Sequence, residues 1–228
     1  MSLIEISNLN KTYNTSSVAV HAVKDLNLSI EKKEFTAIVG PSGSGKTTLL
    51  NIIGGLDSPT DGAVRIDGVD ISTLSSGQIV DYRLNNIGFV FQAYNLIPVL
   101  TAKENVEFIM LLQDVPKKER EQKAEELLES VGLGDRLNTR PSNLSGGQQQ
   151  RVAVARALAS RPNFVLADEP TANLDSASAE SLLDLMEELN EKYEMTFIFS
   201  THDEKVMKRA RRVVTLVDGK IDKDVKNN

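Results

Sequence analysis

The chain has 228 residues, of which 40% are hydrophobic and 25% charged, and its formal net charge is −6. That composition is ordinary for a globular protein, argues against disorder and does not indicate a generally basic nucleic-acid-binding surface. The absence of cysteine excludes disulfides, thiolate catalysis and cysteine zinc sites, and it fits a reducing cytoplasm. The first residues do not resemble a secretory signal, and no apolar run approaches the roughly 20 residues that span a bilayer. We therefore expect any membrane role to come through a partner.

Antiparallel strands are predicted in the N-terminal part of the chain. Leu26, Leu28 and Ile30 alternate with polar residues, which is the pattern of a strand with one buried face. Residues 3–6 and 63–67 have similar short patterns, so we expect an antiparallel β subdomain here.

Three other strands are predicted to be buried on both faces. "FTAIV" (35–39), "FVLAD" (164–168) and "MTFIFS" (195–200) are nearly continuous apolar runs rich in β-branched and aromatic residues. Each is followed by polar or glycine-rich residues and then by a helical pattern. This is the βαβ arrangement, in which ligands bind at the carboxyl ends of the strands.

The middle of the chain is predicted to be helical. Thr101 and Glu104 form a capping-box pattern before a helix over 102–113. Pro116 then begins a charged amphipathic helix, which ends near Gly132.

These patterns predict a single domain over residues 1–228. Residues 1–92 and 144–228 would form the α/β core with its antiparallel β subdomain, and about 93–143 a helical subdomain. The polar residues 222–228 are predicted to be a frayed tail.

A phosphate-binding loop is predicted at "GPSGSGKTT", between a buried strand and a helix. Its glycines allow backbone N–H groups to surround phosphate oxygens, and the helix N-terminus adds partial positive charge. Lys46 would bridge the outer phosphates, and Thr47 would offer a hydroxyl to Mg²⁺. The expected nucleotide-binding residues are Gly40, Ser42, Gly43, Ser44, Gly45, Lys46, Thr47 and Thr48.

Hydrolysis of a bound nucleotide also requires acidic residues. Asp168 ends a buried strand and would hold Mg²⁺, while the adjacent Glu169 would polarise the attacking water. Gln92 and His202 likewise follow apolar strands, so Gln92 could sense metal or water and His202 could contact the terminal phosphate. His21 is interpreted as structural.

Taken together, the motifs resemble the nucleotide-binding subunit of an ABC transporter, and the resemblance covers essentially the whole chain. The phosphate loop corresponds to Walker A, Gln92 to the Q-loop, "LSGGQ" (144–148) to the signature, 164–168 to Walker B and His202 to the H-loop. The resemblance implies an α/β P-loop NTPase fold of the ABC ATPase type. That fold has a mixed core sheet flanked by helices, an antiparallel β subdomain and a helical subdomain.

The same resemblance implies roles for further residues. Tyr13 would stack on adenine, Asp175 in the D-loop would communicate between two sites, and Glu169 would be the catalytic base. The catalytic set would be Glu169, His202, Gln92 and Lys46, and the metal set Thr47, Gln92 and Asp168. In a head-to-tail homodimer, each ATP would be covered by the partner's signature residues Ser145, Gly146, Gly147 and Gln148.

A finer resemblance is to the subfamily that serves lipoprotein-release and macrolide-type exporters, carried by "IIGGLDSPTDG" and "FVFQAYNLIPVLTAKENV". It implies transmembrane permease subunits as partners, ATP and Mg²⁺ as cofactors, no nucleic acid, and a cytoplasmic position on the inner face of the membrane. The permease would dock on the segment after Gln92. Its exposed-looking apolar residues are Tyr94, Leu96, Ile97, Val99 and Leu100.

Two other functions stay open at this point. One is a soluble ABC ATPase that acts as a scaffold or regulator without a membrane partner. The other is a small-molecule kinase that uses the same phosphate loop, which the signature and Glu169 disfavour.

Overall fold

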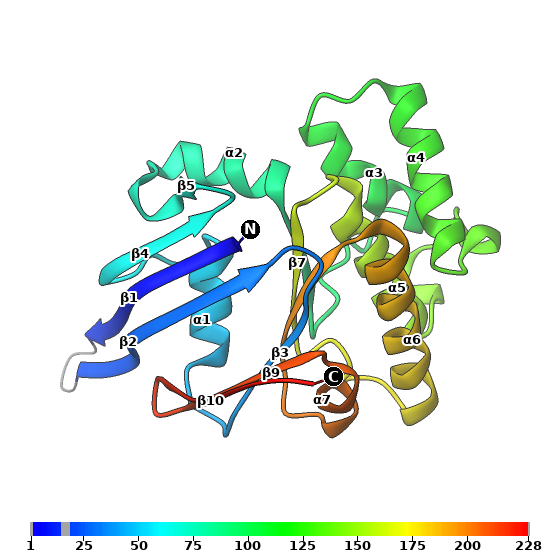
Figure 1. Cartoon of the computed structure of the whole chain (residues 1–228). Coiled ribbons are helices and arrows are strands. Elements are labelled where there is room, and N and C mark those ends of the chain that lie inside the picture. The colour runs from blue at the N-terminus through cyan, green and yellow to red at the C-terminus, as the bar shows by residue number, and fades with distance from the viewer. Residues whose placement is uncertain (1, 15–18, 228) are drawn as a thin grey trace.

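The computed structural model describes residues 2–14 and 19–227 of the chain (Figure 1). Its strands form a four-stranded antiparallel sheet, in the order β2-β1-β4-β5, and a six-stranded mixed sheet, in the order β10-β9-β3-β8-β7-β6. In the first sheet the strands are β1 (Ser2–Asn14), β2 (Ala19–Glu31), β4 (Asp61–Ile66) and β5 (Val69–Asp70). In the second they are β3 (Phe35–Val39), β6 (Ile87–Phe91), β7 (Phe164–Asp168), β8 (Thr196–Ser200), β9 (Arg212–Val217) and β10 (Lys220–Lys226).

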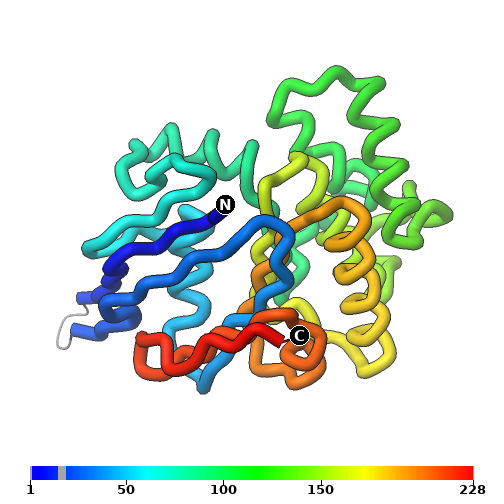
Figure 2. The backbone as a smooth tube through the Cα atoms, in the orientation of Figure 1, coloured from blue at the N-terminus to red at the C-terminus, as the bar shows by residue number. Residues whose placement is uncertain are grey.

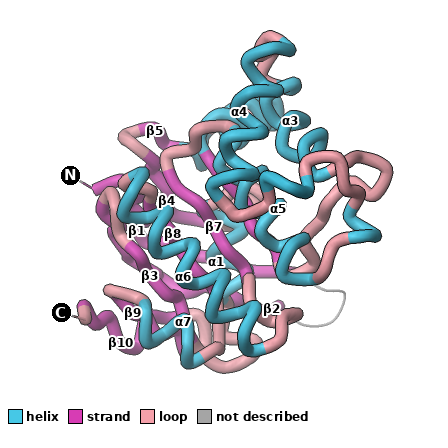
Figure 3. The backbone as a smooth tube through the Cα atoms, turned by 90° about the vertical axis from the view of Figure 1, so that its right-hand side faces the viewer, coloured by secondary structure: helices cyan, strands magenta, loops and turns pink. Residues whose placement is uncertain are grey.

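Helices lie on both faces of the mixed sheet and extend away from it at one corner (Figures 1 and 3). The α-helices are α1 (Lys46–Ile53), α2 (Ser76–Asn86), α3 (Ala102–Leu112), α4 (Lys117–Ser130), α5 (Gly146–Ala159), α6 (Ser176–Tyr193) and α7 (Glu204–Arg209). Short 3₁₀ turns lie at Ile71–Thr73, Gly134–Arg136 and Pro141–Asn143. Among the described residues, none of these helices has the length and apolarity needed to cross a bilayer.

The two faces of the mixed sheet are covered by different parts of the chain. Alternate residues of a strand point to opposite faces, and β7 shows the consequence. Phe164 and Leu166 belong to one buried cluster with α1 and the antiparallel sheet, whereas Val165 and Ala167 belong to the other, with residues of α3 to α6. Helix α1 therefore lies between the two sheets, and the continuous apolar runs of the central strands are explained by burial on both sides.

The antiparallel sheet confirms the predicted alternation. Leu26, Leu28 and Ile30 are buried, and the residues between them are exposed. The prediction of a frayed tail at 222–228 is wrong, because most of that segment belongs to β10, which pairs with β9 in antiparallel register. Strand β10 lies at the edge of the mixed sheet (Figure 2). Its side chains are mainly exposed, as expected for an edge strand, so its polar composition resembled that of a tail.

Residues 93–143 contain α3, α4 and two of the 3₁₀ turns. Helix α3 begins with the predicted capping box, in which the Thr101 hydroxyl accepts from Glu104 N–H and the Glu104 carboxylate accepts from Thr101 N–H. Ala124, Leu127 and Leu128 form the buried face of α4. The sequence reasoning missed α2, which has its own capping box at Ser75 and no buried residue.

The register of the parallel strands brings four strand ends into one row. Phe91 pairs with Asp168, Asp168 with Ser200, and Ser200 with Ile38. The residues that follow these ends are Gln92, Glu169, Thr201–His202 and the phosphate loop. Hydrogen bonding between strands thus places motifs from distant parts of the sequence along one edge.

Candidate active site

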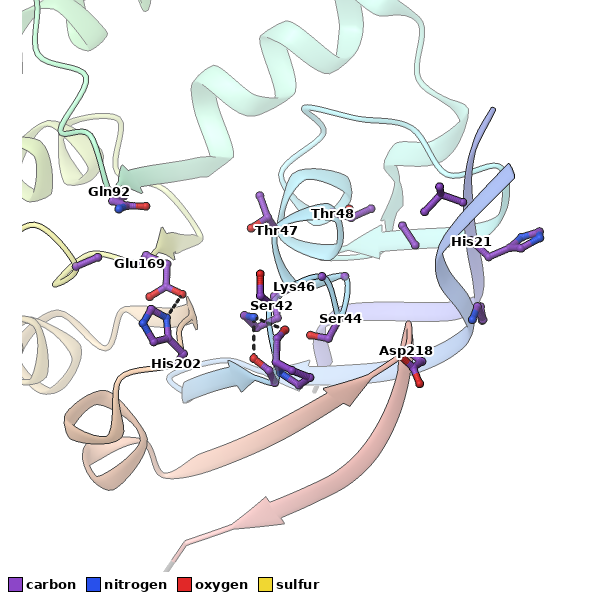
Figure 4. Close-up of a pocket in the computed structure, with 18 residues that line it drawn as sticks. His21, Ser42, Ser44, Lys46, Thr47, Thr48, Gln92, Glu169, His202 and Asp218 are labelled. Atoms are coloured by element: carbon purple, nitrogen blue, oxygen red, sulfur yellow. Dashed lines mark hydrogen bonds and ion pairs between the residues drawn. The ribbon is translucent and has the colours of Figure 1, made fainter. Parts of the chain in front are cut away.

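A cavity of about 670 Å³ opens at this edge of the sheet (Figure 4). The whole predicted phosphate loop, Gly40 to Thr48, lines it, together with Gln92, Glu169 and His202. The opposite end is lined by Val20, His21, Ala22, Lys24 and Asp218. The volume is in the range of pockets that hold small-molecule ligands and cofactors.

The phosphate loop requires glycine at two points for different reasons. Gly45 has φ +100°, and a Cβ there would lie 2.3 Å from the carbonyl oxygen of Ala22. Gly43 has φ +79° and no atom within 4 Å of an added Cβ, so it leaves open space beside the backbone. Helix α1 starts directly afterwards, at Lys46, and its N-cap Gly45 offers no side-chain acceptor to the first N–H groups. These donors therefore form a site for an anion.

Two side chains of the loop are suited to phosphate oxygens. The Lys46 ammonium donates to the carbonyl oxygens of Gly40 (2.8 Å) and Pro41 (3.1 Å) and forms no ion pair with the described residues. The Ser44 hydroxyl is buried and has no hydrogen-bond partner among them. Buried polar groups are normally paired, and a phosphate oxygen in the cavity would supply the missing acceptor.

Oxygen donors suitable for a divalent cation meet beside the loop. The Thr47 hydroxyl lies 3.5 Å from Oδ1 of Asp168, between the start of α1 and the end of β7. Burial raises the pKa of Asp168, and the nearby carboxylate of Glu169 raises it further. A hydroxyl, a carboxylate and bound phosphate are the hard oxygen ligands that Mg²⁺ prefers, so the residues present fit this metal.

Both oxygens of the Glu169 carboxylate are held. His202 Nδ1 lies 2.7 Å from Oε1, and the Thr201 hydroxyl donates to Oε2 at 3.3 Å (Figure 4). The Glu169 side chain is 18% exposed, whereas that of His202 is 76% exposed and borders the cavity. The carboxylate is thus fixed against the protein on one side, and the histidine remains accessible to a ligand.

Gln92 begins the segment after β6 and is linked to the loop after β7. Its Nε2 donates to Oδ1 of Asn173 at 3.5 Å, and Asn173 Nδ2 donates back to the Gln92 carbonyl at 2.9 Å. The exposed Gln92 side chain lines the cavity on the same side as Glu169 (Figure 4).

Comparison with known proteins identifies this arrangement. A family model described as ABC transporter matches residues 23–172. The chain belongs to the ABC transporter family. It is 48% identical to the ABC transporter ATP-binding protein YvrO of Bacillus subtilis, over 96% of this chain and 95% of that protein. It is 45% identical to the macrolide export ATP-binding/permease protein MacB of Aggregatibacter actinomycetemcomitans, over 98% of this chain and 35% of that longer protein.

A solved structure supports the same assignment. The ATP-binding cassette MJ0796, a protein of Methanocaldococcus jannaschii, has been solved as a dimer in a post-hydrolysis state bound to ADP and Pi. It matches this structure with a TM-score of 0.90 and 43% identity, over 99% of each chain. The predicted fold class and family are confirmed, and the chain is an ATP-binding, ATP-hydrolysing subunit of an ABC transporter.

The ABC signature lies outside this chain's own cavity. Ser145 caps α5 in a capping box with Gln148, and Gly146 and Gly147 follow in the first turn. Ser145 is exposed, and none of these four residues lines the cavity. Asp175 caps α6, where its carboxylate accepts from Ala177 N–H, Ser178 N–H and the Ser178 hydroxyl.

Of two aromatic side chains near the cavity, one lines it and the other does not. His21, interpreted from sequence as structural, is exposed and lines the cavity, although its Nδ1 also lies 2.9 Å from the Thr12 hydroxyl. Tyr13, the predicted adenine platform, does not line it. Its cross-strand neighbour Val20 does, and the Tyr13 hydroxyl donates to Asp57 at 2.7 Å.

Sequence reasoning missed Gln150, which connects several parts of the ABC site. This glutamine is fully buried on α5, and its Nε2 donates to the carbonyls of Pro170 (2.9 Å) and Phe91 (3.3 Å). It therefore ties the signature helix to the loop after Glu169 and to the end of β6. The sequence did contain a signal for this role, because Gln150 lies on the same helix face as the apolar residues Val154 and Ala157. A polar side chain on a buried helix face needs hydrogen-bond partners.

The segment predicted to dock a permease is less exposed than expected. Of the five apolar residues singled out, Val99 is exposed, at 71%, and Tyr94, Leu96, Ile97 and Leu100 are half-buried. Leu96 packs on the larger core cluster. The exposed-looking pattern was wrong for four residues because the chain folds back here, with Arg156 donating to the carbonyls of Tyr94 and Asn95.

A groove of about 470 Å³ runs beside this segment. Most of its lining is apolar and comes from α2, β6 and α3, including Val80, Phe89, Phe108 and Leu112. Val80 and Leu112 are each about half exposed.

Proposed function

We propose that this chain powers a membrane export or mechanotransmission complex of the lipoprotein-release and macrolide-efflux type, working as an ATP-dependent homodimer on permease subunits. The observation that carries the proposal is the division of the ATP site. Glu169, His202 and the phosphate loop share one cavity, while the signature lies outside it with Ser145 exposed. A signature that does not line its own chain's cavity is suited to the nucleotide of a second copy.

In this proposal the phosphate loop binds the ATP phosphates through its N–H groups, Lys46, Ser44 and Thr48. Tyr13 stacks on the base. The Glu169 carboxylate, fixed by Thr201 and His202, accepts a proton from the attacking water. His202 and Gln92 border the space where that water and the terminal phosphate meet. The chain thus supplies positioning and a base, which phosphoryl transfer requires.

We further propose that Mg²⁺ is held by Thr47, Asp168 and Gln92. When bound, it would neutralise charge on the outer phosphates. The close approach of Thr47 to Asp168 and the oxygen chemistry of all three side chains support this set.

The proposed dimer is head-to-tail, with Ser145, Gly146, Gly147 and Gln148 of one copy covering the ATP of the other. The exposed N-cap residue of α5, Ser145, supports this arrangement, because a helix N-terminus stabilises negative charge. The dimeric structures of the similar MJ0796 cassette support the formation of a dimer.

The permease is proposed to dock in the groove beside the segment after Gln92. Most of the lining is apolar, and the two arginines in it, Arg83 and Arg156, donate to backbone carbonyls. An apolar segment of the permease would cover the exposed side chains of Val80 and Leu112. This contact would hold the chain on the cytoplasmic face of the membrane.

Purification of the tagged chain from detergent-solubilised membranes tests this function. We expect recovery of an integral permease. Recovery of soluble partners alone would support the alternative of an ABC ATPase that serves as a scaffold or regulator.

A further inference from the structure

A compact polar cluster lies beside the predicted base platform and has no assigned role. Tyr13 Oη donates to Oδ2 of Asp57 at 2.7 Å, and Lys11 Nζ lies 2.6 Å from Oδ1 of the same carboxylate. The Lys11 ammonium also lies over the Tyr13 ring, 4.8 Å from its centroid. The Asp57 carboxylate therefore holds the Tyr13 hydroxyl, and the Lys11 ammonium covers one face of the Tyr13 ring.

The anchor of this cluster is itself held in place. Lys11 Nζ donates to the Ser58 carbonyl at 2.7 Å, and Ser58 N–H donates to the Asp57 carboxylate at 2.7 Å. Thr60 N–H donates to the Asn10 carbonyl at 2.8 Å, so the segment after α1 is joined to β1. Because α1 begins at the phosphate loop, the ring of Tyr13 is tied to the element that would hold the phosphates.

The position of the cluster suits contact with the base of a nucleotide. Tyr13 pairs across the strands with Val20, which lines the cavity, and Tyr13 itself is 37% exposed. The lysine covers one face of the ring, so a base would stack on the opposite face. A cation on one face of an aromatic ring is attracted to its π electrons and limits rotation of the ring.

The protonation states agree with this geometry. Burial raises the pKa of the Tyr13 hydroxyl, and the hydrogen bond to Asp57 raises it further. Burial alone would raise the pKa of Asp57, but the hydrogen bonds from Lys11 and Tyr13 outweigh it and the pKa is lowered. At neutral pH the phenol is thus a neutral donor and Asp57 an ionised acceptor.

We propose that Lys11 and Asp57 are positioning residues that hold the Tyr13 ring as the platform for the nucleotide base. The proposal rests on the proposed stacking role of Tyr13, and it adds that the platform is built by two residues that never contact ATP. Removing either one should weaken binding of the base and leave binding of the phosphates intact.

The test compares a ligand with a base and one without. For Lys11→Met and Asp57→Ala we expect KM for ATP to rise about threefold to tenfold with kcat retained, given the strength of cation–π and stacking contacts. The inhibition constant of inorganic tripolyphosphate should stay unchanged. Lys32→Met is the matched control, because it removes an exposed ion pair with Asp67 in the same subdomain.

A double-mutant cycle with Tyr13→Ala separates this proposal from a general loss of stability. If Lys11 acts through the ring, Lys11→Met should cause no further rise in KM once Tyr13 is alanine. The proposal would be overturned if Lys11→Met or Asp57→Ala weakened binding of tripolyphosphate as much as binding of ATP. It would also be overturned if Lys11→Met raised KM by the same factor in the Tyr13→Ala background as in the wild-type chain.

The same set of variants separates the two levels of the proposal. If Tyr13→Ala raises KM while Lys11→Met and Asp57→Ala do not, the positioning role is wrong and the stacking role stands. If Tyr13→Ala leaves KM unchanged, the stacking role is wrong and the positioning role falls with it.

Discussion

His202 Nδ1 lies 2.7 Å from Oε1 of Glu169 in the cavity, so the histidine and the acid are paired across the ends of two neighbouring strands. The pairing follows from the register of β7 and β8, in which Asp168 faces Ser200. Thr201 holds the other carboxylate oxygen of Glu169. Its hydroxyl donates to Oε2 of Glu169 and accepts from Asp203 N–H. The position of the proposed base is therefore set by the protein itself.

Glu169→Gln should stop turnover and trap an ATP-bound dimer. The amide has nearly the size of the carboxylate but cannot accept a proton, and the loss of a general base lowers rates by about 10²- to 10⁴-fold. Light scattering at saturating MgATP should show a dimer, with the wild-type chain without nucleotide as the monomeric control. A variant that remains monomeric would contradict the two-copy site.

Thr201→Val should lower kcat about tenfold with little change in the KM for ATP. The substitution keeps the size of the side chain and removes the hydrogen bond that orients Glu169, which is worth on the order of 1.5 kcal/mol for a charged acceptor. Thr201→Ser retains the hydroxyl and should recover most of the activity. Equal losses for both variants would show that packing, and not the hydroxyl, matters at this buried position.

Ser145→Arg should spare ATP binding and stop hydrolysis, because a bulky side chain would block the approach of the signature to the second copy's nucleotide. The change also removes the cap of α5, which costs about 1 kcal/mol. Ser75→Arg is the matched control, since Ser75 caps α2 in the same type of capping box with Gln78. ATP affinity and ATPase rate should be measured for both, and equal effects of the two would point to capping alone.

Val80→Asp and Leu112→Asp should prevent recovery of the permease, because each places a charge in the apolar groove. Val225→Asp provides the comparison, as Val225 is also about half exposed but lies on β10, at the other edge of the sheet. Copurification from membranes is the measurement. Undiminished recovery with both groove variants would place the docking surface elsewhere.

Asp224 should contribute stability that depends on pH. The hydrogen bond from Arg212 lowers the pKa of Asp224 in the folded chain, so its contribution is present above the unfolded pKa and is lost as pH falls through the folded pKa. Asp224→Asn should lower the free energy of unfolding by about 0.5–1 kcal/mol at pH 7. The effect is small because the aspartate is partly exposed. Urea unfolding of the wild-type and Asp224→Asn chains should be measured between pH 7 and pH 3. The difference between their free energies of unfolding should shrink as the pH falls, and a difference independent of pH would contradict the ion pair.

The sequence by itself determined the fold class, the family and the phosphate loop. The reason is that these depend on local patterns: apolar runs of the right length, glycines before a helix start, and capping boxes such as Thr101 with Glu104. The pentapeptide "LSGGQ" and the acidic pair after β7 are contiguous in the same way, so they could be recognised without coordinates.

The tertiary structure decided which side chains meet. Strand register placed the Thr201 hydroxyl against the Glu169 carboxylate. The return of the chain after α1 placed Asp57 against Tyr13. Helix packing placed Gln150 against the Pro170 carbonyl. The tertiary structure also made β10 an edge strand. Four of the five apolar residues singled out after Gln92 became half-buried. Such contacts join residues far apart in the chain, and they depend on pairing and packing across the whole domain, which no local pattern encodes.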